Sequence, residues 1–183
     1  MNYDLMGKQL MLHEGVRLTP YVDTEGFNTC LVGYNIDARG WDFVEKTLRV
    51  KISGPLETLI FTRDQALAVL KADILRIEGV IKAGLMPEYV NLDAIRQRVV
   101  VDMAFNMGRK ALNFKKARAA LVAKDHSRVA RELYASRWAK QVGDGKTVAE
   151  GGKFGREDRL AQMVLTGQEP SDREWLQFLS AAA

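Results

Sequence analysis

The chain has 183 residues, of which 47% are hydrophobic and 27% charged, a composition typical of a globular protein with one sizeable core. No apolar run approaches the roughly 20 residues that a membrane span needs, and the single cysteine, Cys30, excludes an internal disulfide. The formal net charge of +4 fits an ordinary solvated surface, or attraction to a polyanion such as cell wall, lipopolysaccharide or nucleic acid.

The first half of the chain predicts one helix followed by a small sheet. Residues 3–13 place Met6 and Leu10 four apart, as on one helix face, and Gly15 is a plausible stop. From residue 17 to about residue 51, β-branched and aromatic residues alternate with glycines, a pattern typical of short antiparallel strands and turns.

A long helix is predicted from residue 62 to about residue 83. Thr62 and Gln65 form a capping box at its start, and Gly84 with Pro87 ends it. Its apolar residues recur at helical spacing: Leu70, Ile74, Ile77 and Ile81. Such a helix would connect a sheet-rich half to a helical half.

The second half of the chain predicts helices only. Asn91 can cap a helix over 92–107 that is apolar nearly all round and should be buried in the centre. Further helices are expected at 114–123, 126–140 and 156–166, with a glycine-rich, mobile loop at 142–155. A second capping box, Ser171 to Glu174, opens a segment with Trp175 and Leu179 on one side.

We therefore predict an α+β fold with a single domain over residues 1–183. Its parts are a sheet lobe at about 14–60, a connecting helix at 62–83, and a helical lobe of 91–183 together with the helix 3–13. His13 and His126 are far apart and no phosphate-binding glycine motif is present, so we expect no metal and no cofactor.

Two carboxylates and one hydroxyl near the N-terminus suggest the chemistry of glycosidic bond cleavage. Glu14 follows the first predicted helix, whose C-terminal dipole favours an uncharged side chain, as a proton donor requires. Asp23 lies in a polar turn and should stay ionised, and Thr29 can hold a water by donating and accepting hydrogen bonds. Spacing alone also fits two ordinary surface acids, so the neighbouring residues must decide.

Those neighbours resemble the T-even phage lysozymes, which form family 24 of the glycoside hydrolases. The resemblance covers almost the whole chain, with gaps at the two loops, and rests on four groups of residues. These are Glu14-Gly15, Arg17-Leu18, Tyr21, Asp23 to Gly26, Thr29 and Gly33; Leu92 to Ala94, Met103, Phe105 and Met107-Gly108; Ser136 to Trp138; and Arg156, Arg159 and Thr166-Gly167.

The resemblance implies a lysozyme-like fold and an inverting muramidase. Such an enzyme cuts the β-1,4 bond between N-acetylmuramic acid and N-acetylglucosamine in peptidoglycan. Glu14 would be the general acid, and Asp23 would act with Thr29 on the attacking water. Inverting enzymes keep their two carboxyls roughly 6.5–9.5 Å apart, which leaves space for that water.

Further site residues carry over from the resemblance as candidate substrate contacts. Asn35 and Phe105 would face the sugar, Asn106 could line the same cleft, and Arg156 would approach the catalytic glutamate. The alternatives are core packing for Phe105 and a surface helix start for Arg156. Arg137 would form an ion pair or contact substrate, and the neighbouring Trp138 should lie in the core.

The sequence also departs from the family pattern. Leu31 replaces a glycine and Tyr34 replaces a histidine, while two sugar-contact positions are Ala117 and Glu132. The catalytic trio is intact but the cleft wall is altered, which leaves substrate preference open. Cys30 is best explained as a small buried hydrophobic residue.

Three biological roles remain open at this stage. The leading one is a phage or prophage endolysin that accumulates in the host cytoplasm, because residues 1–13 do not resemble an export signal, and that depends on a holin to reach the wall in the periplasm. The others are a virion-associated lysozyme for DNA entry and a catalytically weak peptidoglycan-binding module. We expect a monomer without a nucleic-acid partner. Residues 171–183 would either cap the helical core or contact an anionic outer-membrane surface.

Overall fold

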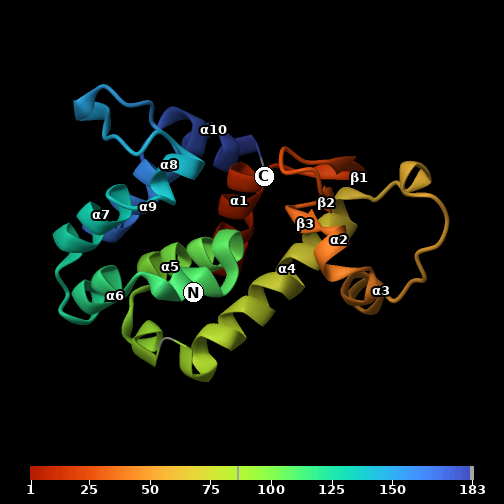
Figure 1. Cartoon of the computed structure of the whole chain (residues 1–183), viewed down its shortest axis with the longest axis horizontal. Helices are drawn as coiled ribbons and strands as arrows, with labels where there is room; N and C mark the ends of the chain where they lie inside the picture. Colours follow the sequence, from red (N-terminus) through yellow and green to blue (C-terminus); the bar gives the residue numbers. More distant parts are fainter. Residues whose placement is uncertain (86, 182–183) are drawn as a thin grey trace. The chain divides into compact units, whose positions relative to one another are not determined.

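The computed structural model of the chain describes residues 1–85 and 87–181. It is mostly helical, with one three-stranded antiparallel sheet near the N-terminus (Figure 1), which confirms the predicted α+β class. Contacts divide the chain into two compact units, Tyr3–Arg76 and residues 1–2 with 77 onward. The lobe boundaries given above stay a prediction.

The first unit contains a helix, the sheet and several short helices. Its elements are α1 (Tyr3–Glu14), β1 (Arg17–Val22), β2 (Asn28–Leu31), β3 (Tyr34–Asn35), α2 (Ile36–Arg39), α3 (Asp42–Leu48), η1 (Leu56–Thr58) and the greater part of α4 (Arg63–Val80). The strands lie in the order β1-β2-β3, and Thr29 pairs with Tyr21 on one side and Asn35 on the other.

The predicted sheet is confirmed, but its strands end earlier than expected. Helices α2 and α3 occupy residues 36–39 and 42–48, where strands and turns were predicted. The Asn35 side chain starts α2 by accepting a hydrogen bond from the Ala38 amide at 2.8 Å. This local cap overrides the β-prone composition of the segment.

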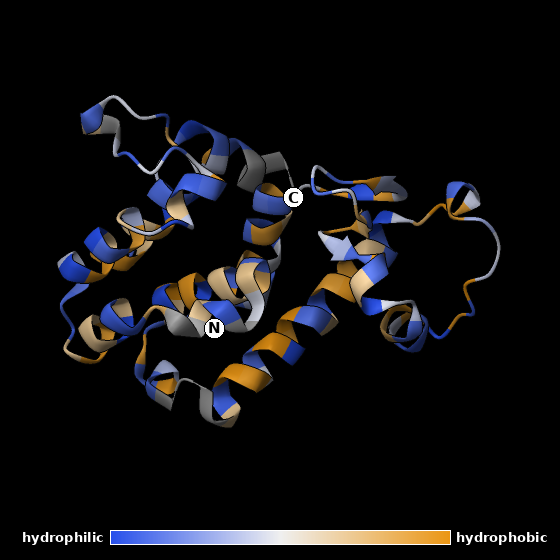
Figure 2. Cartoon of the chain, viewed as in Figure 1, coloured by the Kyte–Doolittle hydropathy of each residue, from blue (hydrophilic) through white to orange (hydrophobic). Residues whose placement is uncertain are grey.

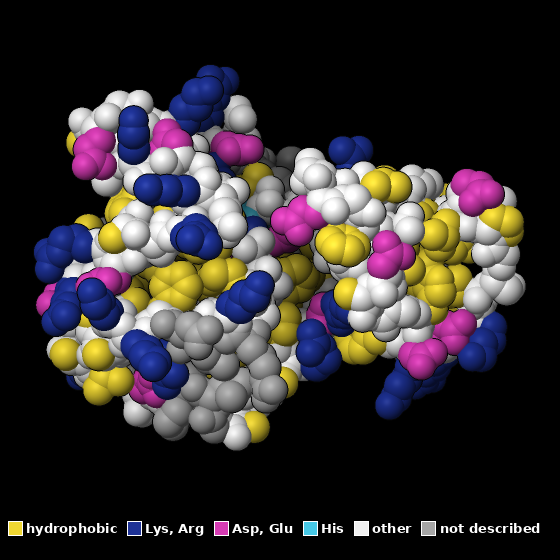
Figure 3. All heavy atoms as spheres, in the orientation of Figure 1, with side chains coloured by type: hydrophobic (Ala, Val, Ile, Leu, Met, Phe, Trp, Pro, Cys, Tyr) yellow, Lys and Arg dark blue, Asp and Glu magenta, His cyan; other side chains and the backbone are white. Residues whose placement is uncertain are grey.

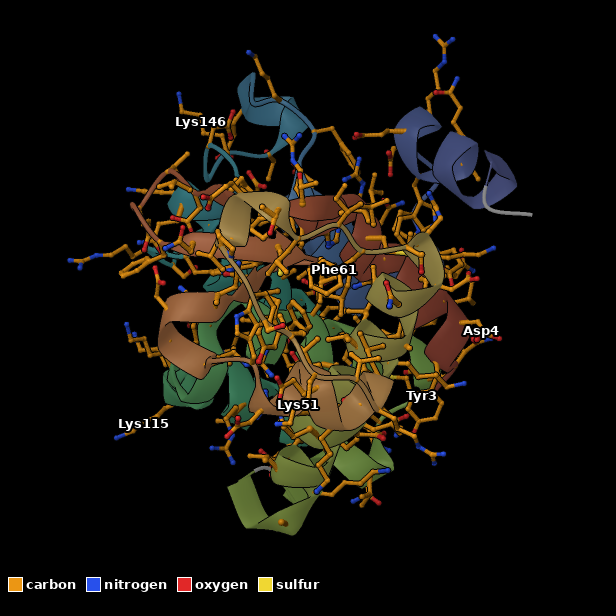
Figure 4. All side chains as sticks on the ribbon, turned by 90° about the vertical axis from the view of Figure 1, so that its right-hand side faces the viewer. Tyr3, Asp4, Lys51, Phe61, Lys115 and Lys146 are labelled. Atoms are coloured by element: carbon orange, nitrogen blue, oxygen red, sulfur yellow. The ribbon has the colours of Figure 1, made fainter. Side chains whose placement is uncertain are left out.

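Apolar side chains of the strands and of α3 pack into the core of this unit. Cys30 is fully buried there, as a small hydrophobic residue should be. Phe61, labelled in Figure 4, is 7% exposed, and its ring centroid lies 5.9 Å from that of Trp41. The core thus joins the sheet to the segment that leads into α4.

Helix α4 begins with the predicted capping box. The Gln65 amide donates to the Thr62 hydroxyl at 3.2 Å, and the Gln65 side chain accepts from the Thr62 amide at 2.8 Å. Hydrophobic and hydrophilic residues alternate along the helix (Figure 2), and the four predicted apolar positions are buried. The helix continues into a π-helical turn, Ile81–Leu85.

The second unit is helical throughout its described residues. Its elements after α4 and that turn are η3 (Pro87–Asn91), α5 (Ala94–Met107), η4 (Gly108–Asn113), α6 (Lys115–Val122), α7 (His126–Tyr134), α8 (Ala139–Val142), η5 (Val148–Glu150), α9 (Arg156–Thr166) and α10 (Arg173–Ala181). In the described ranges, every helix is too short or too polar to cross a membrane.

Helix α5 is buried as predicted, but its N-cap is Asp93 and not Asn91. The Asp93 carboxylate accepts from the amides of Ile95 and Arg96, both at 3.0 Å. Asn91 instead ends the preceding 3-10 helix. Asp93 is the residue directly before the first turn of α5, and its negative charge also interacts favourably with the helix dipole.

Two further predictions about helix boundaries were wrong. The helix expected at 126–140 is divided into α7 and α8, and in the break between them the Ser136 hydroxyl accepts from the Ala139 amide at 3.1 Å. The capping box expected at Ser171 is replaced by Asp172, which accepts from the Trp175 amide at 3.0 Å. Trp175 is fully buried, whereas the Leu179 side chain lies outside the described residues.

Candidate active site

Glu14 is the last residue of α1, and its carboxylate lies against the turn between β2 and β3. A side chain at Gly33 would place its Cβ 3.3 Å from Glu14 Oε2, and Gly33 has a φ of +59°. Both the close approach and the left-handed backbone therefore favour glycine at this position. The Gly33 backbone is a neighbour of Glu14 that the sequence analysis did not assign to the site.

Asp23 organises the turn between β1 and β2. Its Oδ1 accepts hydrogen bonds from the amides of Glu25 and Phe27, both at 2.9 Å. The Thr29 hydroxyl donates to Asp23 Oδ2 at 3.0 Å, from a side chain that is almost fully buried. The sheet register places them together, because Thr29 pairs with Tyr21, two residues before Asp23.

Hydrogen bonds stabilise the ionised form of Asp23. The bond from the Phe27 amide, with further bonds from Thr29 and Glu25, holds the pKa of Asp23 below its usual range. Asp23 is therefore ionised at neutral pH, as the sequence analysis expected. A carboxylate with a lowered pKa is a weak base, so such a residue acts best by orienting a water and stabilising positive charge.

Asn35 belongs to the same unit as Glu14, Asp23 and Thr29, but part of its side chain is already engaged. Its Oδ1 accepts from the Ala38 amide as the cap of α2. The Nδ2 group is the part of this amide that could donate to a sugar. Its role as a substrate contact stays a prediction.

The other predicted site residues belong to the second unit. Asn106 Oδ1 accepts from Trp138 Nε1 at 3.1 Å, and Trp138 is 3% exposed, which confirms its place in the core. Phe105 is half-buried at the C-terminal end of α5. Arg137 is exposed and forms no ion pair with any residue in the described ranges, so the ion pair expected for it is absent there.

Arg156 starts α9 and forms a buried ion pair with Asp102 of α5. Arg156 Nη2 and Nε each lie 2.8 Å from Asp102 Oδ1, and the two residues are 7% and 0% exposed. Arg156 is therefore not a simple surface helix start, which was the alternative considered. Asp102 was missed, although one acid inside an apolar helix is itself a sign of a buried partner.

Two of the four departures from the family pattern lie in the sheet of the first unit, where Leu31 ends β2 and Tyr34 begins β3. Leu31 has a left-handed backbone, with a φ of +57°, and its side chain is 2% exposed. The Tyr34 hydroxyl donates to the Gly40 carbonyl at 2.8 Å, and the Arg39 guanidinium stacks 4.2 Å from its ring while also binding Asp73. Both residues thus have structural roles in the first unit.

Metal binding finds no support among residues 1–85 and 87–181, where no three His, Cys, Asp or Glu side chains are grouped so that they could hold an ion.

Comparison with known proteins gives the chain its family. The family model described as phage lysozyme matches residues 11–157. A protein named probable T4-type lysozyme 1, from Dictyostelium discoideum, is 30% identical over 168 residues, which cover 86% of this chain and 92% of that protein. The matched region includes the pairing of Asp23 with Thr29 and the Glu14 carboxylate beside Gly33. This chain therefore belongs to the phage lysozyme family.

Proposed function

We propose that the protein hydrolyses the β-1,4 bond between N-acetylmuramic acid and N-acetylglucosamine in peptidoglycan by a single inverting displacement. Membership of the phage lysozyme family supports a muramidase activity on peptidoglycan. The observation that carries the mechanism is the 3.0 Å hydrogen bond from Thr29 to Asp23.

That hydrogen bond leaves suitable acceptors for one water molecule. The Thr29 hydroxyl donates its hydrogen to Asp23 Oδ2, so its lone pairs can accept a hydrogen bond from a water molecule. Asp23 Oδ1 is occupied by two amides, whereas Oδ2 retains a lone pair for the second water proton. A water held by Asp23 and Thr29 would direct its own lone pair at the anomeric carbon, as inversion requires.

Glu14 is the proposed general acid. It would protonate the leaving glycosidic oxygen while the water attacks the opposite face of the sugar. We assign five residues as candidate substrate contacts. Asn35 belongs to the first unit, and the others belong to the second: Phe105, Asn106, Arg137 and Arg156. The Asp102 ion pair supports Arg156 as a fixed cation in this set.

The proposed biological role is that of an endolysin that lyses the host. It would gather in the bacterial cytoplasm and reach the wall after a holin opens the membrane. The name of the matching family supports a phage connection for such proteins. A virion-associated lysozyme would carry out the same chemistry, and genome context would separate the two roles.

Digestion of purified peptidoglycan tests the reaction. We expect wild type to release fragments with reducing muramic ends, and Glu14→Gln to release them at least about 10²-fold more slowly because the proton donor is lost. Mass spectrometry of the fragments is the measurement. Anhydro-muramic ends would contradict the proposal, since they arise without an attacking water. Equal rates for wild type and Glu14→Gln would refute the role of Glu14.

Substitution of Thr29 tests the water site. Thr29→Val removes the hydroxyl at nearly constant volume and should lower kcat by about 10²-fold, whereas Thr29→Ser keeps the hydroxyl and should retain most activity. Because Thr29 is one of the groups that lower the pKa of Asp23, the acid limb of the pH–rate profile should move to higher pH in Thr29→Val. An unchanged profile, or equal losses in both variants, would argue against this site.

A further inference from the structure

An open groove lies in the second unit, and none of the residues proposed for catalysis lines it. It has a volume of about 560 Å³, within the range of small-molecule sites. Its lining comes from α7, the loop 143–155, α9 and the two residues before α10: Ala130, Tyr134, Thr147, Phe154, Asp158, Ala161, Gln162, Leu165, Ser171 and Asp172. Helices α7 and α9, which both contribute lining residues, run side by side (Figure 1).

Two aromatic rings, those of Phe154 and Tyr134, line the groove. Phe154 is 39% exposed, and the Arg159 guanidinium lies 5.8 Å from its ring centroid. The Tyr134 hydroxyl donates to Asp158 at 2.8 Å, which orients its ring. Flat apolar faces of this kind pack against the C–H face of a sugar ring.

The groove also contains polar side chains that are available to form hydrogen bonds with a ligand. Within the described part of the chain, the Gln162 amide and the Ser171 hydroxyl have no hydrogen-bond partner. An amide can donate to and accept from an acetamido group, and a hydroxyl can do the same with a sugar hydroxyl. Small side chains, Ala130 and Ala161, leave room between these groups.

The loop that carries Phe154 is held by carboxylates. Asp144 accepts from the amides of Lys146 and Lys153 at 2.8 and 2.9 Å, which closes the loop on itself. Glu157 at the start of α9 accepts from the Asp144 amide at 2.8 Å. A loop held in this way loses little conformational entropy when a ligand binds in the groove, which favours affinity.

Charges of both signs lie at the groove, because Asp158 and Asp172 line it and basic residues flank it. Lys146, Lys153 and Arg173 are exposed, and each is adjacent in sequence to a lining residue. The Lys146 side chain extends outward from the loop (Figure 4), and Figure 3 shows Lys and Arg side chains across this unit. The flanking cations would favour a ligand that carries carboxylates beside neutral sugars.

We propose that this groove is a second carbohydrate-binding site, which holds N-acetylhexosamine units of a glycan strand. The proposal rests on the proposed function, because the same polymer would then be both substrate and ligand. A site on α7 and α9 that binds without cleaving increases the local concentration of the enzyme on an insoluble wall, as any linked second contact does. It would not change the chemistry of a short soluble substrate.

Saccharide binding is tested on the full-length Glu14→Gln chain, which should not cleave the ligand. The tetramer of N-acetylglucosamine is titrated while backbone amides are followed by NMR. We expect saturable shifts at Gly155, Gln162 and their neighbours, absent in Phe154→Ala and restored in Phe154→Tyr. Leu176→Ala is the matched control, because Leu176 is 53% exposed in the same unit but does not line the groove. Shifts that leave the groove amides unchanged would overturn the proposal.

Wall binding separates this proposal from the catalytic one. In the otherwise wild-type chain, Phe154→Ala and Gln162→Leu should raise KM for purified sacculi by about tenfold and leave kcat on a soluble oligosaccharide unchanged. A midpoint of thermal unfolding within a few degrees of wild type verifies that each variant is folded.

If wild type cleaves walls but both variants bind them as well as wild type does, the proposed second binding site is refuted. If wild type releases no fragments, the proposed function fails instead. Displacement by polyglutamate but not by the saccharide would show a purely ionic surface and refute the sugar site.

Discussion

Leu31 illustrates how a single residue can be both strained and stabilising. Its φ of +57° is unfavourable for any side chain with a Cβ, at a cost of about 1–2 kcal/mol. Its side chain is nevertheless 2% exposed and packs in the core of the first unit beside Cys30 and Tyr34. Burial of a leucine contributes about 2–5 kcal/mol, so the packing outweighs the strain.

This balance predicts an unusual order of stability. Leu31→Ala loses the packing and keeps the strain, whereas Leu31→Gly loses the packing and relieves the strain. We expect both variants to be destabilised by about 2–4 kcal/mol, with Leu31→Gly the more stable of the two by about 1 kcal/mol. Urea unfolding measures both. A glycine variant less stable than the alanine variant, which is the usual order, would show that the left-handed backbone carries no strain.

At the level of elements, the start of α5 depends on one carboxylate. Asp93 accepts from two amides and forms an ion pair with Arg96, while Asn91 ends the preceding turn. Burial acts to raise the pKa of Asp93, but the bonds from the Arg96 amide and guanidinium outweigh it and lower the pKa below its ordinary value. Stability from Asp93 is therefore present above the unfolded pKa and lost as pH falls through the folded one.

Asp93→Ala should reduce the free energy of unfolding by about 1 kcal/mol at neutral pH, with Asn91→Ala as a control that changes it by less than about 0.5 kcal/mol. The difference between wild type and Asp93→Ala should shrink once the pH falls below about 4, where the unfolded carboxyl is already protonated. Denaturant titrations at several pH values measure this. A larger effect at Asn91 would restore the cap predicted from the sequence.

At the level of the whole molecule, the basic excess is unevenly distributed. Residues 77–183 contain 18 Lys and Arg against 13 Asp and Glu, whereas residues 3–76 contain 9 against 10. The outward side chains of Lys115 and Lys146 in Figure 4 belong to the basic unit. An anionic wall would therefore be attracted chiefly to residues 77 onward, by forces that salt screens.

Cleavage of intact walls should weaken as salt rises. Between 50 and 200 mM salt we expect the rate on sacculi at low substrate to fall by about threefold to tenfold, because exposed charges lose their long-range attraction. The rate on a neutral soluble oligosaccharide serves as the control and should stay constant. A rate on sacculi that does not depend on salt would contradict a role for this charge in wall binding.

The sequence by itself determined the features that depend on neighbouring residues. Helical periodicity predicted α1 and α4, and the reciprocal Thr62 and Gln65 groups predicted a cap that the structure confirms. The spacing of Glu14, Asp23 and Thr29 within a recognisable motif predicted the family. These signals are readable because each arises from contacts only a few residues apart along the chain.

Only the tertiary structure decided which distant groups meet. Asp102 pairs with Arg156, 54 positions away in the sequence, and Arg39 pairs with Asp73, 34 positions away. No local sequence pattern could predict either pair. Asp93 replaces Asn91 as the cap, since both are good caps locally and the chain's path selects between them. The groove under Phe154 likewise arises from segments brought together by packing, because burial and pairing energies depend on three-dimensional neighbours rather than on spacing along the chain.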